Sequence, residues 1–263
     1  MPAMYAHDTF GLKAARELPF SVKKLILQYP QLFRAGLQGP DILFFYNPFT
    51  EHPIGNIGRR LHKKTARSFL ENAREIWKEG GKSPSQAAYL LGFLCHFMLD
   101  SACHPYIGRQ VKAIGVGHVA IETEFERLLL TLDGRNPISF PVGYCLPLDE
   151  EIAHDIAPFY PGVSTKEMKK SLHAMRRYKN LLVMPNGAVQ MLAKKGLRLI
   201  GQYNAITQHI IGPKADLRCR MTCEHLLELY RRTISQATAE MEKFSKALET
   251  DGPFSQRLNR TFE

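Results

Sequence analysis

Long apolar runs are missing from this sequence. The longest apolar stretch, Ala87 to Leu99, is shorter than the roughly 20 residues of a membrane-spanning helix and contains His96. The first residues, Met1 to Asp8, also lack the basic segment and the apolar segment of a secretory signal. Neither a transmembrane span nor secretion is therefore expected.

Cysteine is scarce and unevenly spaced. The five cysteines are Cys95, Cys103, Cys145, Cys219 and Cys223. An odd number at irregular spacing, without a secretory signal, favours reduced thiols over a disulfide framework. We therefore expect a cytoplasmic protein, bound to a membrane only at its periphery if at all.

Strand signals are almost absent as well. Alternating β-branched runs closed by Asn-Gly or Asp-Gly turns hardly occur, and Asp133-Gly134 reads as a helix stop. Hydrophobic residues make up 44% and charged residues 23% of the chain, which are globular values that exclude disorder. The sequence therefore predicts an all-α, multi-helix bundle forming a single helical domain over residues 1–263.

Helical periodicity and the placement of Pro and Gly predict the individual elements. Residues 47–58 are predicted as a loop. Ser83-Pro84 opens a helix that is apolar almost all round, as is typical of the buried centre of a bundle, and we expect it to end at Pro105. Ser164 and Glu167 have the spacing of a capping box. The predicted helices are 9–17, 21–28, 61–78, 84–103, 118–132, a short one near 149–157, 164–182, 187–211 and 222–248.

The charge balance is strongly basic, with 35 Lys and Arg against 25 Asp and Glu. A surplus of this kind favours anionic partners such as phosphate esters, nucleic acid or an anionic lipid surface. The densest clusters belong to a basic helical C-terminal half at 164–249, where each could equally be a solvated helix face. They comprise Lys166, Lys169, Lys170, Arg176, Arg177, Lys179, Lys194, Lys195 and Arg198.

Histidines and carboxylates recur at helical spacing in the first half of the chain. His96, Asp100 and His104 fall at i, i+4 and i+8, on one face of the central helix. His118 and Glu122 repeat the i, i+4 spacing at the start of the next helix. Imidazole nitrogen and carboxylate oxygen are zinc ligands, and side chains one turn apart can reach one ion. The spacing therefore indicates a metal-site core at about 1–132.

Each member of this set has an alternative interpretation. A single histidine in a core helix is usually a hydrogen-bonded structural residue, and Asp100 could form an ion pair with Arg109. Because an isolated buried carboxylate is costly, a metal ion or an arginine must compensate its charge. Two consecutive His/carboxylate pairs together favour the metal.

Further candidates lie upstream. Asp41 follows Gly39-Pro40 at a tight turn, where it could instead cap the following segment. His62 opens the predicted helix 61–78, and His7 lies near the N-terminus. The interval from Asp41 leaves open whether His62 or His52 is the better ligand.

The ordered set of these residues resembles the zinc-dependent phospholipase C family, mainly over residues 1–130. The segment from Cys95 to Tyr106 is most similar to the cytoplasmic, uncharacterised branch. The motifs that carry the resemblance are His7, Gly39-Pro40-Asp41, His62, His96-x-x-x-Asp100, His104 and His118-x-x-x-Glu122.

The resemblance implies an all-helical fold with two or three Zn²⁺ ions per chain. One ion would be held by Asp41, His62, His96 and Asp100, and a second by His104, His118 and Glu122. In secreted members a third ion is bound by a histidine matching His7, a carboxylate matching Asp100 and an N-terminal Trp, which this chain lacks. The expected catalytic residues are Asp41, as ligand and general base, and Asp100, as a bridging carboxylate.

The implied activity is that of a phosphodiester hydrolase releasing a phospholipid head group through metal-activated water. One alternative is a zinc-dependent nuclease or other phosphodiesterase on the same site, for which Phe44, Phe45 and Tyr46 could stack bases. A second is a non-catalytic helical protein that binds membrane or nucleic acid through its basic helices. The expected partners are thus a phospholipid or other phosphodiester and an anionic membrane surface, with nucleic acid less favoured.

Overall fold

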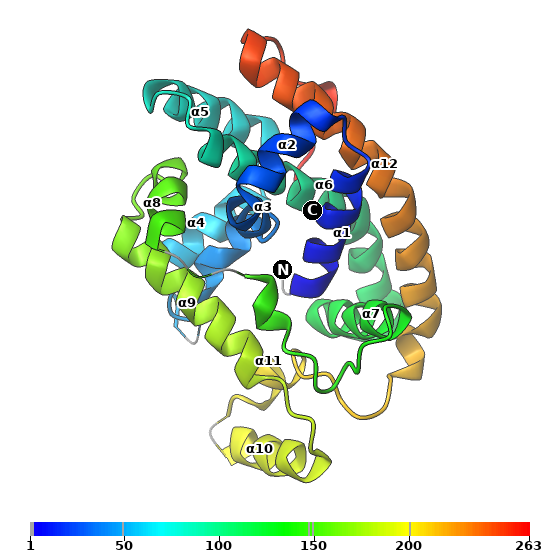
Figure 1. The fold of residues 1–263 in the computed structure, drawn as a ribbon. Coiled ribbons are helices and arrows are strands. Elements are labelled where there is room, and N and C mark those ends of the chain that lie inside the picture. Colours follow the sequence, from blue (N-terminus) through cyan, green and yellow to red (C-terminus); the bar gives the residue numbers. More distant parts are fainter. Residues whose placement is uncertain (1–2, 49, 147, 149, 200) are drawn as a thin grey trace.

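The computed structural model describes residues 3–48, 50–146, 148, 150–199 and 201–263. Within these ranges the chain is a set of helices joined by turns (Figure 1), and its β-structure is confined to an isolated bridge between Thr65 and Thr261. The all-α prediction is confirmed. None of the helices described has an apolar stretch that could cross a membrane.

Helix α6, Pro84–Ile114, is the central element. Every residue from Gln86 to Ser101 is buried, because three helices pack on this segment: α1 (Met4–Arg16), α3 (Pro30–Gly36) and α12 (Arg220–Thr250). An apolar helix enclosed on all sides is what the sequence predicted for this segment.

Glycines allow α3 and α6 to touch through their backbones. A Cβ atom on Gly92 would lie 2.1 Å from the carbonyl oxygen of Phe33, and one on Gly36 would lie 2.2 Å from that of Tyr89. No larger residue fits at either position. The close approach brings Leu37, directly after α3, against the face of α6 that carries His96.

The predicted end of this helix at Pro105 is wrong, because α6 continues through the proline to Ile114. Proline inside a helix removes one backbone hydrogen bond and costs about 3 kcal/mol. Burial of Ile107 in the core, with Tyr106 and Val111 packed beside it, offsets that cost.

The prediction of a loop at 47–58 is also wrong. These residues include most of α4, Pro53–His62, which is followed by α5, Ala66–Glu79. His62 therefore ends one helix instead of opening the next. The sequence contained the correct signal, since Pro53 occupies the first turn of α4 and the ring of His52 caps it by accepting from the Ile54 N–H at 3.3 Å.

The remaining elements surround this centre. The predicted capping box at Ser164 and Glu167 is confirmed, whereas the predicted helix 187–211 is divided at Gly201, which has a φ of 69°. Asp149, in the short predicted helix, lies outside the described residues. The other α-helices are α2 (Phe20–Gln28), α7 (His118–Leu132), α8 (Glu150–Ile156), α9 (Thr165–Leu181), α10 (Gly187–Leu199) and α11 (Tyr203–Thr207). The 3-10 turns are η1 (Gly39–Phe45), η2 (Val142–Cys145), η3 (Ala157–Phe159), η4 (Leu217–Cys219) and η5 (Gln256–Asn259).

Candidate metal centre

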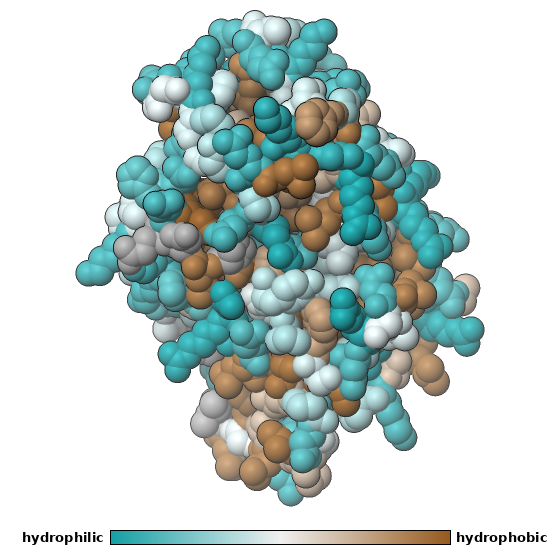
Figure 2. All heavy atoms as spheres, viewed as in Figure 1, coloured by the Kyte–Doolittle hydropathy of each residue, from teal (hydrophilic) through white to brown (hydrophobic). Residues whose placement is uncertain are grey.

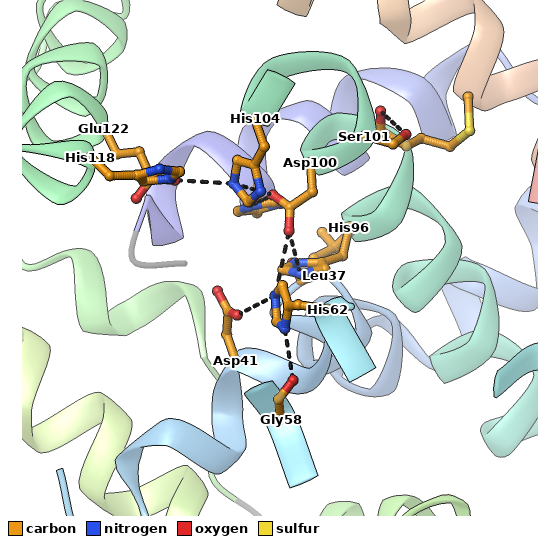
Figure 3. A network of polar contacts seen from close by, with 12 residues as sticks. Leu37, Asp41, Gly58, His62, His96, Asp100, Ser101, His104, His118 and Glu122 are labelled. Atoms are coloured by element: carbon orange, nitrogen blue, oxygen red, sulfur yellow. Dashed lines mark hydrogen bonds and ion pairs between the residues drawn. The ribbon is translucent and has the colours of Figure 1, made fainter. Parts of the chain in front are cut away.

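Five elements bring all eight predicted ligand residues to one region beside α6. They are His7 from α1, Asp41 from η1, His62 from α4, His96, Asp100 and His104 from α6, and His118 and Glu122 from α7. Figure 3 shows seven of these side chains pointing toward one another. All are buried except His118, which is partly exposed.

The side chains form three groups whose ligand atoms lie within 4.8 Å of one another in each group. The groups are Asp41, His62 and His96; His104, His118 and Glu122; and His7, His96 and Asp100. The predicted pairing of His104 with the α7 residues is thus present as geometry. His52, the alternative to His62, belongs to none of these groups.

The carboxylate of Asp100 lies between the groups. Its Oδ1 is 3.2 Å from Nε2 of His7 and 3.3 Å from Nε2 of His104. Its Oδ2 is 3.0 Å from Nε2 of His96 and 3.7 Å from Nε2 of His62. The alternative ion pair with Arg109 is absent, because that guanidinium lies over the ring of Tyr106. A carboxylate between imidazoles on both sides has the position of a bridging ligand.

Backbone carbonyls fix two of the imidazole rings. The Nδ1 of His62 donates to the carbonyl oxygen of Gly58 at 2.9 Å, and the Nδ1 of His96 donates to that of Leu37 at 3.2 Å. A ring nitrogen that donates to a carbonyl must carry the proton. The Nε2 atom of each ring therefore keeps its lone pair for a ligand.

These lone pairs are not used within the protein. Although Nε2 of His96 and Oδ2 of Asp100 are 3.0 Å apart, their alignment does not make a hydrogen bond, and neither atom has another hydrogen-bond partner. Nε2 of His62 and Oε2 of Glu122 are likewise buried without a hydrogen bond. Buried polar atoms are nearly always satisfied, so these unpaired atoms fit a metal cluster. In the group on α7, Oε1 of Glu122 lies 3.2 Å from Nε2 of both His104 and His118, at hydrogen-bond distance.

Electrostatics favour ionised carboxylates in this cluster, and the attraction of Asp100 and Glu122 outweighs burial to raise the pKa of His104. Burial opposes ionisation of Asp100 and Glu122, yet neighbouring imidazoles lower the pKa of both carboxyls well below the usual range: His104 and His96 act on Asp100, and His104 and His118 on Glu122. Burial, aided by the charge of His96, lowers the pKa of His7 to about 4. The carboxylates are therefore ionised and His7 is neutral near pH 7.

A model of the family described as zinc dependent phospholipase C matches residues 6–180. This chain belongs to the zinc-dependent phospholipase C family. The match extends beyond the first 130 residues on which the resemblance rested, and it includes all eight of the predicted ligand positions. No curated protein and no solved structure matches the chain.

A cleft of about 510 Å³ opens on the His/carboxylate cluster of this phospholipase C family member. Its lining includes His62, His104 and His118 from the cluster, together with Phe44, Arg59, Lys63, Gly108, Val119 and Glu263. Arg59 and Lys63 were missed from the sequence. Their i, i+4 spacing around His62 could have indicated them. That spacing places two side chains on one face only if the segment is helical, and the helix predicted at 61–78 began after Arg59.

The segment around Phe262 packs against the cluster, and no sequence motif indicated this contact. The Phe262 ring lies 5.1 Å from that of His62 and 6.0 Å from that of His96, and its backbone N–H donates to the His62 carbonyl at 3.3 Å. Arg67 anchors the same segment by donating to the carbonyls of Phe254 and Ser255.

Proposed function

We propose that the protein is a zinc-dependent phosphodiester hydrolase that releases the head group of a phospholipid. The observation that carries the proposal is the clustering of three His/carboxylate groups, two of which reach one cleft through His62, His104 and His118, in a member of a zinc-dependent family. Catalytic zinc sites need access to substrate, whereas structural sites are closed by protein ligands. The exposed side of His118 at the cleft supports the catalytic alternative.

Two ions are supported by two groups that share no member. Asp41, His62 and His96 would hold one ion, and His104, His118 and Glu122 the other, with Asp100 bridging. His7 with Asp100 would contribute to a third ion. His96 could not also serve that third ion, because its Nδ1 is occupied by Leu37 and it offers a single nitrogen. We therefore expect two ions, and a third where His7 finds ligands other than His96.

The chain's own groups would position and activate the substrate. Bound zinc supplies Lewis-acid chemistry, neutralising phosphate charge and lowering the pKa of water. Asp41, beside His62 at 3.1 Å, would orient and accept the proton of the attacking water. Arg59 and Lys63 at the cleft wall would bind the non-bridging phosphate oxygens, and Phe44 would contact the apolar part of the substrate.

Metal analysis after purification without chelator tests the centre. We expect two or three zinc ions per chain, and substantially less in His62→Ala. His52→Ala is the matched control at the other end of α4, where a helix cap and a ring contact with Tyr46 are lost. A chain that binds no zinc, or an equal content in both variants, would overturn the proposal.

Substrate class is tested by turnover of the zinc-loaded protein. We expect hydrolysis of a chromogenic phosphocholine ester and of phospholipid in mixed micelles, and a loss of about a hundredfold or more in kcat/KM for His62→Ala. Faster cleavage of single-stranded DNA would indicate the nuclease instead. Inactivity on all three substrates would favour the non-catalytic binding protein.

A further inference from the structure

The positive charge of the chain is concentrated in one segment. Residues 168–215 contain nine Lys and Arg side chains and no Asp or Glu. The rest of the chain is almost balanced, with 26 Lys and Arg against 25 Asp and Glu, out of totals of 35 and 25. The nine cations are Lys169, Lys170, Arg176, Arg177, Lys179, Lys194, Lys195, Arg198 and Lys214. This segment comprises most of α9 and all of α10 and α11, and it is the positive pole of the molecule.

Helix α10 is the outermost helix of this basic segment. Figure 1 shows it at the lower end of the molecule, beyond α9 and beside α11. Gln190 is the buried side chain of the helix, and its Nε2 donates to the carbonyls of Met184 at 2.8 Å and Ile211 at 3.1 Å. These two hydrogen bonds fix which face of α10 looks toward the protein and which looks outward.

The outward face of α10 carries exposed apolar side chains. At about 100° per residue, Leu192 and Leu199 share one side of the helix, roughly opposite Gln190. Leu192 is 72% exposed and Leu199 is 89% exposed, and the adjacent Met191 is 58% exposed. Figure 2 shows apolar side chains gathered at this end of the molecule. A helix normally turns its apolar side toward the core, so this orientation needs an external apolar phase or partner.

Cations accompany the apolar face. Lys195 lies between Leu192 and Leu199 on the same side, and Arg198 lies beside it with its guanidinium 4.4 Å from the ring of Tyr203. Long basic side chains can extend from an apolar surface to phosphate groups while their methylenes stay buried. Apolar anchors with adjacent Lys and Arg, and no acid, match the chemistry of an anionic membrane surface.

We propose that α10 is a membrane anchor that lies in the plane of an anionic bilayer. Met191, Leu192 and Leu199 enter the boundary between head groups and acyl chains, and Lys195 and Arg198 bind lipid phosphates. This surface lies outside the region 6–180 that matches the family. The proposal rests on the proposed function only in that a phospholipid substrate gives membrane binding its purpose.

The anchor is coupled to the cleft through α11. Gln208, at the end of α11, accepts at its backbone carbonyl from Thr123 of α7 at 2.8 Å. Gly117, directly before His118, lies so close to Gln208 that a Cβ there would be 2.5 Å from Oε1. The segment that carries α10 is therefore in contact, through Gln208, with the end of α7 that contributes His118 to the cleft.

Co-sedimentation of the zinc-loaded protein with vesicles tests the anchor. We expect binding to phosphatidylcholine vesicles that contain phosphatidylserine and much weaker binding to phosphatidylcholine alone. Leu192→Gln/Leu199→Gln should reduce the partition coefficient by about tenfold or more. Lys195→Gln/Arg198→Gln should reduce the preference for phosphatidylserine and the sensitivity to salt.

The matched control is Lys24→Gln/Leu27→Gln on α2. Both side chains are exposed, Leu27 by 67%, and they lie on a helix remote from α10 in Figure 1. Circular dichroism checks that every variant is folded. Equal losses in the control and the α10 variants, or no binding to anionic vesicles, would overturn the proposal. So would concentration-dependent dimerisation abolished by Leu192→Gln/Leu199→Gln, or binding to RNA in preference to vesicles.

Binding and catalysis are separated by a water-soluble substrate. The α10 variants should hydrolyse the chromogenic phosphocholine ester at the unaltered rate while losing activity on vesicles. Vesicle binding without any hydrolysis would refute the proposed function and leave the anchor standing. Hydrolysis of the soluble ester without vesicle binding would refute the anchor alone.

Discussion

At the scale of single residues, the clustering of the candidate ligands could be predicted, but the backbone groups that hold their rings could not. The i, i+4 spacing of His96 and Asp100 places them on one face whatever the tertiary structure. The carbonyl of Leu37, which fixes the ring of His96, is a backbone group whose position depends on how α3 meets α6. No side-chain pattern encodes such a contact.

Gly39 combines a left-handed backbone conformation with a close contact to His96 of the candidate metal centre. Its φ is 51°, and a Cβ atom would lie 2.4 Å from Cδ2 of His96. We expect Gly39→Ala to cost about 2–4 kcal/mol, from left-handed strain and from overpacking. It should also displace the imidazole and lower the zinc content, as measured by thermal unfolding and metal analysis.

Gly115 provides the matched control for this substitution. Its φ of 65° is similar, but nothing lies within 4 Å of the position of a Cβ. Gly115→Ala should therefore cost only the conformational strain of about 1–2 kcal/mol and leave zinc binding intact. If the two variants had the same stability and the same zinc content, contact with His96 would not explain why position 39 needs glycine.

His209 should make stability depend on pH. Its Nδ1 is buried without a hydrogen bond, and burial together with the charge of Lys179 lowers its pKa from 6.5 to about 4. Between these values the unfolded chain binds a proton that the folded protein excludes. Stability should therefore fall by about 1–3 kcal/mol as pH decreases from 6.5 to 4.

The measurement is urea unfolding across this pH range. His209→Gln should flatten the profile, whereas the same change at the exposed His225 should not. A profile that keeps its slope in His209→Gln would assign the effect to other groups, His7 among them, since its depressed pKa acts with the same sign.

At the scale of elements, helices with clear capping residues could be predicted. Helix ends that depend on tertiary packing could not. Ser164 and Glu167 correctly predicted the start of α9 from local chemistry alone. Pro105 was misread as a helix end because the packing that tolerates it is nonlocal. Phe262 is not a metal-ligating residue type, and the adjacent Glu263, which lines the cleft, has no His or Asp at helical spacing that could have linked it to the centre.

Removal of the Phe262 ring should reduce the packing that holds the imidazoles of the candidate centre in place. The ring packs on His62, His96 and Phe97. We expect Phe262→Ala to lower the free energy of unfolding by about 3–5 kcal/mol and to weaken zinc retention in a chelator-competition assay.

Phe254 is a matched control from the same segment. It is similarly buried, but it packs on Phe244 and under the guanidinium of Arg74, away from the centre. Phe254→Ala should destabilise the protein comparably without changing the zinc affinity of the folded state. A parallel loss of zinc in both variants would mean that retention follows global stability alone.

At the scale of the whole molecule, zinc removal should lower stability. The ion-free centre concentrates Asp41, Asp100 and Glu122 in a buried space. Because zinc binds the folded state, it should contribute about 2.7 kcal/mol at a hundredfold excess over its Kd. For a chain of this size that is a decrease in Tm of roughly 5–10 °C on chelation.

Thermal scans before and after chelation, and after readdition of metal, measure this effect. Zinc should restore the Tm, whereas magnesium should not, because imidazole nitrogen is a poor ligand for it. An unchanged Tm would mean that the buried groups compensate one another without an ion. The single-domain organisation over 1–263 and the cytoplasmic location stay predictions.

The ring of His96 has neighbours from both ends of the chain. His7 stacks on it at 4.3 Å and Phe262 lies 6.0 Å from it, although these two residues are 255 positions apart. A nascent chain emerges from the ribosome N-terminus first. The packing of Phe262 against His96 can therefore form only after residue 262 has emerged, so the cluster reaches its full enclosure late in the synthesis of residues 1–263.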